Sequence, residues 1–257
     1  MTSTNRHAHV YLSPHLDDAV LSCGGSIWEQ VQAGESIKVV TIFAGPPDPY
    51  VPLSPFAQSL HARWRMSVDA VKTRQEEDRE ALARLGARPC HWAYRDAIYR
   101  RTPDGGYAYT SEDALWGSVH PSEAELVHEL GDRIGELALV PRGTLYVPLA
   151  VGAHIDHRIV RWAAEGGGRA LLYYEDFPYA EDPERVDAAL GEGRWRPAVV
   201  PLSDEALEAK IAAVACYRSQ MSSFWGSREE MAASVRAFAE RIGGAGAAER
   251  YWRVTAS

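Results

Sequence analysis

The chain has 257 residues, of which 46% are hydrophobic and 24% charged, values typical of a soluble globular protein. Its net charge of −8 argues against a nucleic-acid partner, which requires a basic face, and no apolar run is long enough to cross a membrane. Residues 1–7 lack the apolar core of a signal peptide, and the three cysteines are too widely spaced to suggest a disulfide framework. We therefore expect a cytoplasmic protein with a small-molecule ligand and neither a membrane nor a nucleic-acid partner. The oligomeric state, a homo-oligomer included, is left open.

Apolar, β-branched runs alternate with amphipathic stretches along the chain. The predicted strands are 9–12, 37–43, 88–94, 144–148 and 170–174, with a further short run at 199–201. The predicted helices are 19–33, 67–86, 122–139, 156–164, 204–218 and 229–242. Strand–helix–strand units of this kind predict an α/β fold with parallel strands and right-handed crossovers. We find no linker or repeat and expect one domain over 1–257. The proline-rich stretch 44–55 fits either a pocket wall or a plain surface connection.

The first chemically informative stretch lies between strand 9–12 and helix 19–33. It places His15, Asp17 and Asp18 where a strand ends and a helix begins, which is where ligands collect in an open parallel sheet. A helix N-terminus favours negative charge, so both carboxylates should be ionised there. One imidazole with two carboxylates is a donor set that suits a divalent cation.

A second pair of histidines, His154 and His157, follows strand 144–148 at the start of another predicted helix. Residues three apart on one helical turn share a face, and both strand ends should lie at the same edge of a parallel sheet. Each motif is short enough to occur by chance. Their shared position after strands predicts that the two segments meet around one ion.

The same segments resemble a known family. Pro14-His15-Leu16-Asp17-Asp18 with Gly24-Gly25, and His154-Ile155-Asp156-His157, resemble the two signature segments of the LmbE/PIG-L family of zinc-dependent deacetylases of N-acetylated amino sugars and related amides. Segments 73–77, 94–97 and 173–176 are also similar to this family, so the resemblance spans roughly 8–180. It implies a Rossmann-like open, mostly parallel sheet with helices on both faces.

The resemblance also implies roles for individual residues. His15, Asp18 and His157 would bind zinc, with Fe²⁺ as the other metal considered. Asp17 would be the general base for water attack on the acetyl carbonyl, and a protonated His154 would lie beside the oxyanion. The substrate would be an N-acetylated sugar or glycoconjugate.

Arg74 and Asp96 would contact sugar hydroxyls according to the same resemblance. From the residues alone, the favoured interpretation of Arg74 is an ion pair with Glu77 or Asp78 on a solvated helix, and that of Asp96 is a turn cap. Asp156 fits either an orienting partner of a histidine or a simple carboxylate at a helix start. Leu16 and Ala19 depart from the residues common in the family, which indicates a subgroup with its own substrate.

Two other functional classes remain open from the sequence. A ferrous-iron facial triad, as in oxygenases, needs two histidines and one carboxylate, but that chemistry usually occurs on a β-barrel. A non-catalytic carbohydrate- or nucleotide-binding module would rely on Gly24-Gly25, although no GxGxxG motif is present.

Overall fold

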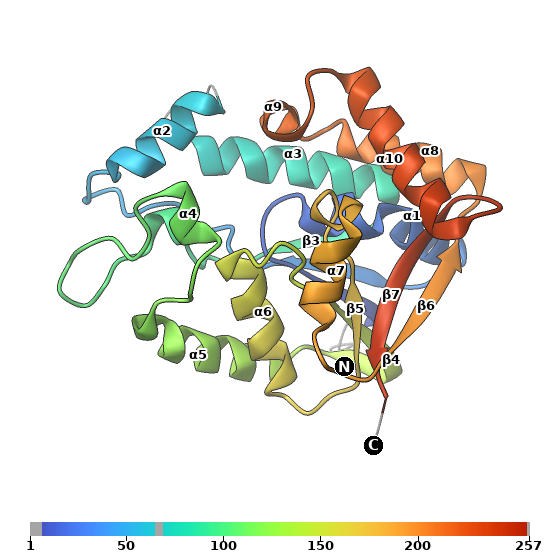
Figure 1. The fold of residues 1–257 in the computed structure, drawn as a ribbon, viewed down its shortest axis with the longest axis horizontal. Helices are drawn as coiled ribbons and strands as arrows, with labels where there is room; N and C mark the ends of the chain where they lie inside the picture. Colours follow the sequence, from blue (N-terminus) through green and yellow to red (C-terminus); the bar gives the residue numbers. More distant parts are fainter. Residues whose placement is uncertain (1–6, 65–68, 256–257) are drawn as a thin grey trace, which may run out of the picture.

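The computed structural model describes residues 7–64 and 69–255, and its centre is a sheet of seven strands (Figure 1). The strands are β1 (His7–Ser13), β2 (Ile37–Thr41), β3 (Arg88–His91), β4 (Leu139–Pro148), β5 (Leu171–Tyr174), β6 (Trp195–Pro201) and β7 (Ala248–Val254). Their order across the sheet is β3-β2-β1-β4-β5-β7-β6. The strands from β3 to β5 are parallel, whereas β7 runs antiparallel to both of its neighbours. The fold is therefore the mostly parallel α/β arrangement that the sequence predicts.

Helices cover both faces of this sheet (Figure 1). One face carries α1 (Asp18–Gln32), α3 (Ala70–Leu85), α8 (Asp204–Val214) and α10 (Arg228–Gly243), and the other carries α5 (Ala124–Gly135) and α6 (Ile155–Glu165). The shorter helices are α2 (Pro55–Arg63), α4 (Glu112–Leu115), α7 (Pro183–Leu190) and α9 (Met221–Phe224), with 3₁₀ turns η1 (Ala97–Tyr99), η2 (Pro121–Glu123) and η3 (Tyr179–Glu181). None of the described helices has the length and apolar character needed to cross a membrane.

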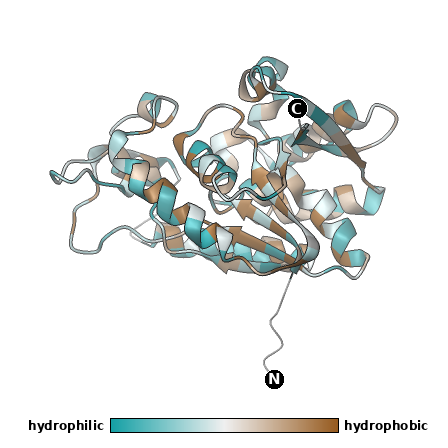
Figure 2. Cartoon of the chain, turned by 90° about the horizontal axis from the view of Figure 1, so that it is seen from below, coloured by the Kyte–Doolittle hydropathy of each residue, from teal (hydrophilic) through white to brown (hydrophobic). Residues whose placement is uncertain are grey.

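The core follows from the composition of the central strands. Val10 and Leu12 of β1, Val40 of β2 and Val147 of β4 are completely buried, because both faces of these strands are covered. In Figure 2 the central strands are brown, whereas the helices carry both brown and teal residues. Burial of the apolar helix faces against the sheet fixes the strand ends, and these ends position the site.

Several element bounds differ from the sequence prediction. Helix α2 was not predicted: Ser54 caps it by accepting the N–H of Ala57, and Pro55 occupies its first turn, where a missing N–H costs nothing. Helix α3 begins at Ala70, and residues 67–68 of the predicted helix lie outside the described residues. The predicted short run at 199–201 is the end of β6, and β7 was not predicted at all.

The glycine pair in α1 permits close packing of α8. A Cβ on Gly25 would lie 2.5 Å from a Leu202 methyl, and one on Gly24 would lie 3.0 Å from Lys210 Cγ. The N–H of Gly25 also donates to the buried carboxylate of Glu249 at 3.0 Å. Both glycines thus face the protein interior, and they form no phosphate-cradling loop of the kind a nucleotide-binding module would need.

The buried pair between Lys210 and Glu249 yields a stability prediction. Their side chains are 2–3% exposed and 2.8 Å apart. Lys210→Met would leave the Glu249 carboxylate buried without its cation, so we expect a loss of about 3–5 kcal/mol in the free energy of unfolding. Urea denaturation would measure this loss of stability. Lys72→Met, at an exposed lysine, is the control. A Lys210→Met protein as stable as this control would contradict the prediction.

Candidate metal and substrate site

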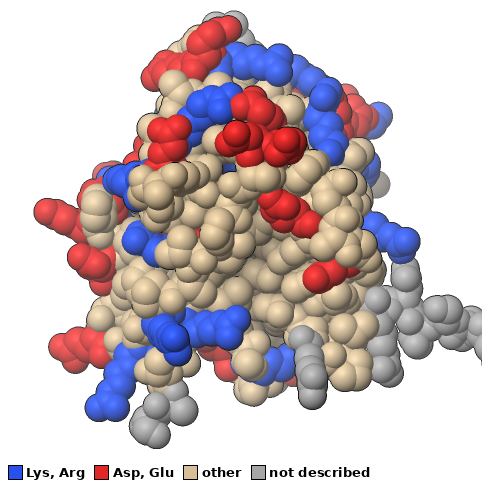
Figure 3. Space-filling view, turned by 90° about the vertical axis from the view of Figure 1, so that its right-hand side faces the viewer, with Lys and Arg blue, Asp and Glu red and all other residues tan. Residues whose placement is uncertain are grey.

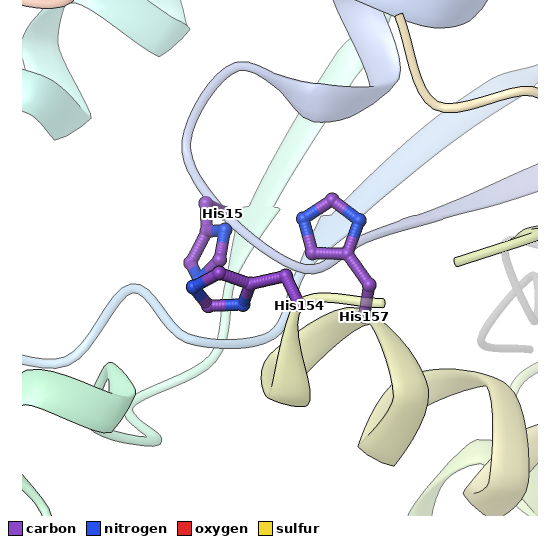
Figure 4. Close-up of side chains that lie close together, drawn as sticks. All are labelled: His15, His154 and His157. Atoms are coloured by element: carbon purple, nitrogen blue, oxygen red, sulfur yellow. The ribbon is translucent and has the colours of Figure 1, made fainter. Parts of the chain in front are cut away.

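The site lies at the carboxyl ends of three neighbouring parallel strands. His15 follows β1, the pair His154 and His157 opens α6 after β4, and Asp176 follows β5. Figure 4 shows the three histidine rings close together, with His15 on the loop before α1, His154 directly before α6 and His157 in its first turn. The two segments that the sequence predicts to meet therefore do lie together. His15 and His154 are 139 positions apart in the chain.

Asp18 bridges two of these imidazoles. Its Oδ2 lies 3.3 Å from Nδ1 of His15 and 3.3 Å from Nε2 of His157. A tetrahedral ion with bonds of about 2.0–2.1 Å holds neighbouring ligand atoms roughly 3.3–3.4 Å apart. The donor types and their spacing therefore fit a divalent ion such as zinc.

His154 offers a further nitrogen to the same space. One nitrogen each from His15, His154 and His157 can be chosen so that all lie within 4.8 Å of one another. The Nδ1 of His154, however, accepts the backbone N–H of Asp156 at 3.2 Å and so caps α6. Burial and the neighbouring His15 hold the pKa of His154 well below its ordinary value. The acceptor contact at Nδ1 leaves Nε2 to carry the hydrogen that a reacting group would meet, and the protonated ring expected from the sequence stays a prediction.

Each of the other two imidazoles has a carboxylate on its remaining nitrogen. His157 Nδ1 lies 2.6 Å from Asp176, whose second oxygen accepts the N–H of Val151. His15 Nε2 lies 2.9 Å from Asp156. Such partners fix the tautomer and the ring orientation of a metal-binding histidine. Asp156 is therefore an orienting partner of His15, one of the two readings that the sequence allowed.

The charges around the two imidazoles favour a bound cation. Burial lowers the pKa of His157, but Asp18 and Asp176 outweigh this effect and raise it to about 10. Burial likewise lowers the pKa of His15, and Asp96, Asp156 and Asp18 raise it well above its ordinary value. The surrounding carboxylates thus attract positive charge to this position.

Asp17 is the first residue before α1, yet its side chain makes no capping hydrogen bond. It is 5% exposed and lies 3.8 Å from a terminal nitrogen of Arg74. Burial, together with the neighbouring Asp18, raises the pKa of Asp17 to about 6. This carboxylate is thus held beside the candidate metal ligands without a structural task at the helix start.

Arg74 and Asp96 both line the cavity next to Asp17. Arg74 lies over the ring of Trp64, 5.3 Å from its centroid. It does not form the ion pair with Glu77 or Asp78 that the sequence allowed. Asp96 caps η1 by accepting the N–H of Ile98 at 3.2 Å, and its other oxygen lies 3.7 Å from Nε2 of His15.

The carboxylates next to Arg74 on α3 have other partners. Glu77 accepts from the backbone and hydroxyl of Ser219, at 3.1 and 2.6 Å. Asp78 binds His91 and the hydroxyl of Tyr217, both at 2.7 Å. These contacts leave the Arg74 guanidinium directed at the cavity, and they anchor the segment that leads into α9.

The cavity has a volume of about 330 Å³. Much of its wall comes from Trp64 and Trp116 and from residues that the sequence analysis missed, namely Leu60, Arg63, Glu112, Leu115, Tyr179, Gln220, Ser223 and Phe224. They come from or adjoin α2, α4, η3 and α9, short elements without a clear periodic signal. Arg63 and Glu112 form an ion pair of 3.1 Å between α2 and α4. Within the described part of the chain, the cavity wall includes none of the proline-rich residues 44–55. Helix α2, which comes next in the chain, contributes Leu60 and Arg63 to the wall.

Comparison with known proteins agrees with this geometry. The model of the family described as "PIG-L: GlcNAc-PI de-N-acetylase" matches residues 10–165. A 2'-N-acetylparomamine deacetylase from Niallia circulans is 26% identical over 240 residues, covering 88% of this chain and 85% of its own length. A crystal structure of a deacetylase in the teicoplanin biosynthesis pathway is 31% identical, with a TM-score of 0.84 and coverage of 97% and 98% of the two chains. The A40926 pseudoaglycone deacetylase Dbv21 is 30% identical, with a TM-score of 0.74 and coverage of 98% and 100%.

The parallel α/β fold, the His/Asp cluster and these relatives together define a hydrolytic N-deacetylase. The family model covers more than half of the chain, and the chain belongs to the PIG-L family. The resemblance found in the signature segments is thereby confirmed. The oxygenase and the non-catalytic module receive no support.

Proposed function

We propose that this protein removes the acetyl group from an N-acetylated amino sugar within a larger glycoside, using zinc held by His15, Asp18 and His157. The observation that carries the metal assignment is the position of Asp18 Oδ2, 3.3 Å from a nitrogen of each imidazole. A related crystal structure is that of the zinc-inhibited form of teicoplanin deacetylase Orf2, so zinc acts on at least one such protein. Because zinc inhibits that protein, Fe²⁺ belongs in the same test.

Zinc, when bound, would lower the pKa of a water molecule and polarise the acetyl carbonyl. Asp17 takes the proton of the attacking water as the new C–O bond forms. The Nε2–H of His154 donates to the developing oxyanion. Asp17 then returns the proton to the nitrogen as the C–N bond breaks, which releases acetate and a free amine. Arg74, 3.8 Å from Asp17, orients this carboxylate and the sugar beside it.

The cavity wall supports a sugar-containing substrate. Arg74 and Asp96 offer a donor and an acceptor for hydroxyl groups, and Trp64, Trp116 and Phe224 offer aromatic surface. Such a wall suits a sugar that carries a further group better than a free monosaccharide. The relatives named for paromamine and for glycopeptide antibiotics act on compounds of that kind.

The proposal is tested by acetate release from N-acetylated amino sugars, offered free and as glycosides, to metal-stripped protein with Zn²⁺ or Fe²⁺ added back. We expect turnover only with added metal, and faster turnover of glycosides than of the free sugar. Metal-independent turnover, or no acetate from any amide tested at a range of metal concentrations, would contradict the proposal.

Arg74→Met is expected to lower kcat/KM by about 10- to 100-fold, because a hydrogen bond to a charged group contributes roughly 1.5–3 kcal/mol. Metal content should stay unchanged, since Arg74 contacts none of the three proposed ligands. Steady-state kinetics and metal analysis would measure both. Arg79→Met, on the exposed side of the same helix, is the control. Equal kcat/KM in the two variants would remove Arg74 from the substrate site.

The cytoplasmic location, the absence of nucleic-acid and membrane partners, and the homo-oligomer left open by the sequence stay predictions. On the face shown in Figure 3, acidic and basic side chains are interspersed around a wide uncharged area. Size-exclusion chromatography with light scattering would determine the oligomeric state.

A further inference from the structure

A buried line of charges leads away from His15. Arg100, directly after η1, is 8% exposed, and its guanidinium contacts two carboxylates. One terminal nitrogen lies 2.6 Å from Oδ1 of Asp156, and Nε lies 2.6 Å from Oε2 of Glu123. Asp156 is completely buried, and Glu123 is 4% exposed. The order along this line is Glu123, Arg100, Asp156 and His15.

The other oxygen of Asp156 completes the connection to the site. Asp156 Oδ2 lies 2.9 Å from Nε2 of His15 and accepts the backbone N–H of Ala97 at 3.1 Å. The two oxygens of this carboxylate thus have separate tasks, one toward Arg100 and one toward the imidazole. The other ring nitrogen of His15, Nδ1, faces Asp18.

A completely buried carboxylate needs a compensating charge to remain ionised. The Arg100 guanidinium, with a terminal nitrogen 2.6 Å from Oδ1 of Asp156, supplies that charge. The guanidinium is itself covered by the rings of Phe43 and Tyr109, at 4.8 and 5.6 Å from their centroids. Arg100 is therefore a largely buried cation, packed between these rings and the two carboxylates.

We infer that Arg100 and Glu123 are positioning residues for metal binding: they hold the Asp156 carboxylate in place, and Asp156 fixes His15 with Nδ1 directed at the ion. This inference rests on the proposed metal site. It adds two residues that contact neither the proposed ligands nor the cavity around them. Loss of a partner that orients a metal-binding histidine typically weakens metal binding by about 10–100-fold.

The test compares Arg100→Met and Arg100→Lys with wild type. Zn²⁺ affinity is measured by competition with a chelator, the Co²⁺-substituted proteins are compared by visible spectroscopy, and unfolding of the metal-free proteins is followed in urea. We expect Arg100→Met to bind Zn²⁺ about 10–100-fold more weakly and to show an altered Co²⁺ spectrum. Arg100→Lys keeps one cation near Asp156, so its Zn²⁺ affinity should lie between those of Arg100→Met and wild type. Lys210→Met, which breaks a buried ion pair away from the site, should lose stability but keep the wild-type affinity and spectrum.

The outcomes separate this inference from the proposed function. A wild-type protein that binds no metal would contradict the metal site itself. A wild-type protein that binds Zn²⁺, together with a folded Arg100→Met of equal affinity and spectrum, would overturn the positioning role alone. If Arg100→Met does not fold, Arg100→Lys decides: weakened binding supports the role, and wild-type binding overturns it.

Discussion

Asp17→Asn should retain its metal and lose about 10²- to 10⁴-fold in kcat, the range typical for loss of a general base. The two side chains have the same shape, but an amide cannot take a proton from water. Asp17 does not cap α1, and its carboxylate lies beside Arg74, so the substitution removes little structure. Acetate release and metal analysis on the same preparation would measure both quantities.

Asp204→Asn provides the matched control, because Asp204 also lies at a helix start but is exposed and outside the cavity. It should behave as wild type. Loss of metal in Asp17→Asn would show that Asp17, and not only Asp18, is a ligand. Full turnover in Asp17→Asn would exclude this residue as the base.

His157→Ala should lose the metal and, with it, all measurable turnover. Its Nε2 lies 3.3 Å from Asp18, and its ring is 2% exposed and held by Asp176 at 2.6 Å. Removal of the imidazole leaves too few donors to hold the ion. Loss of a partner that orients a metal-binding histidine weakens metal binding by roughly 10–100-fold, which is the decrease we expect for Asp176→Asn. We expect the metal affinity of His157→Ala to fall further than that. Equilibrium dialysis followed by elemental analysis would measure the two affinities.

His154→Ala is the matched comparison for His157→Ala, because both histidines lie at the start of α6, His154 as its N-cap and His157 in its first turn. We expect His154→Ala to keep its metal and to turn over much more slowly, since its Nε2–H is proposed to serve the oxyanion. A metal-replete His157→Ala together with a metal-free His154→Ala would reverse the assignment of these two residues.

The sequence predicts the buried parallel part of the sheet, because β1, β2, β4 and β5 are short apolar runs. It fails for β7. That strand reads Ala-Glu-Arg-Tyr-Trp-Arg-Val, and its buried Glu249 is compensated by Lys210, 39 positions away. In the sequence, a carboxylate with so distant a partner resembles a surface residue. The strand therefore lacks the alternation of apolar and polar residues that would predict it.

The same distinction applies to the site. The proposed ligands lie in short motifs directly after strands, so local spacing points to the two segments, and the family resemblance implies which of their residues bind the metal. Other residues reach the site or its supporting contacts only because separate elements pack together. These residues are Asp176, Arg100, Glu123 and Gln220. Asp176 sits in a segment already noted for its family likeness, and its position after β5 was the one available signal. For Gln220, brought to the cavity through the anchoring of Ser219 by Glu77, the sequence holds no comparable signal.

Anomalous X-ray diffraction at the zinc edge, on crystals of the zinc-loaded protein, tests the central claim most directly. The account predicts one peak bonded to His15 Nδ1, Asp18 and His157 Nε2 at about 2.0–2.2 Å, with a position left open toward Asp17. A peak bonded to His154 in place of Asp18, or the absence of a peak between His15 and His157 in zinc-loaded crystals, would contradict it.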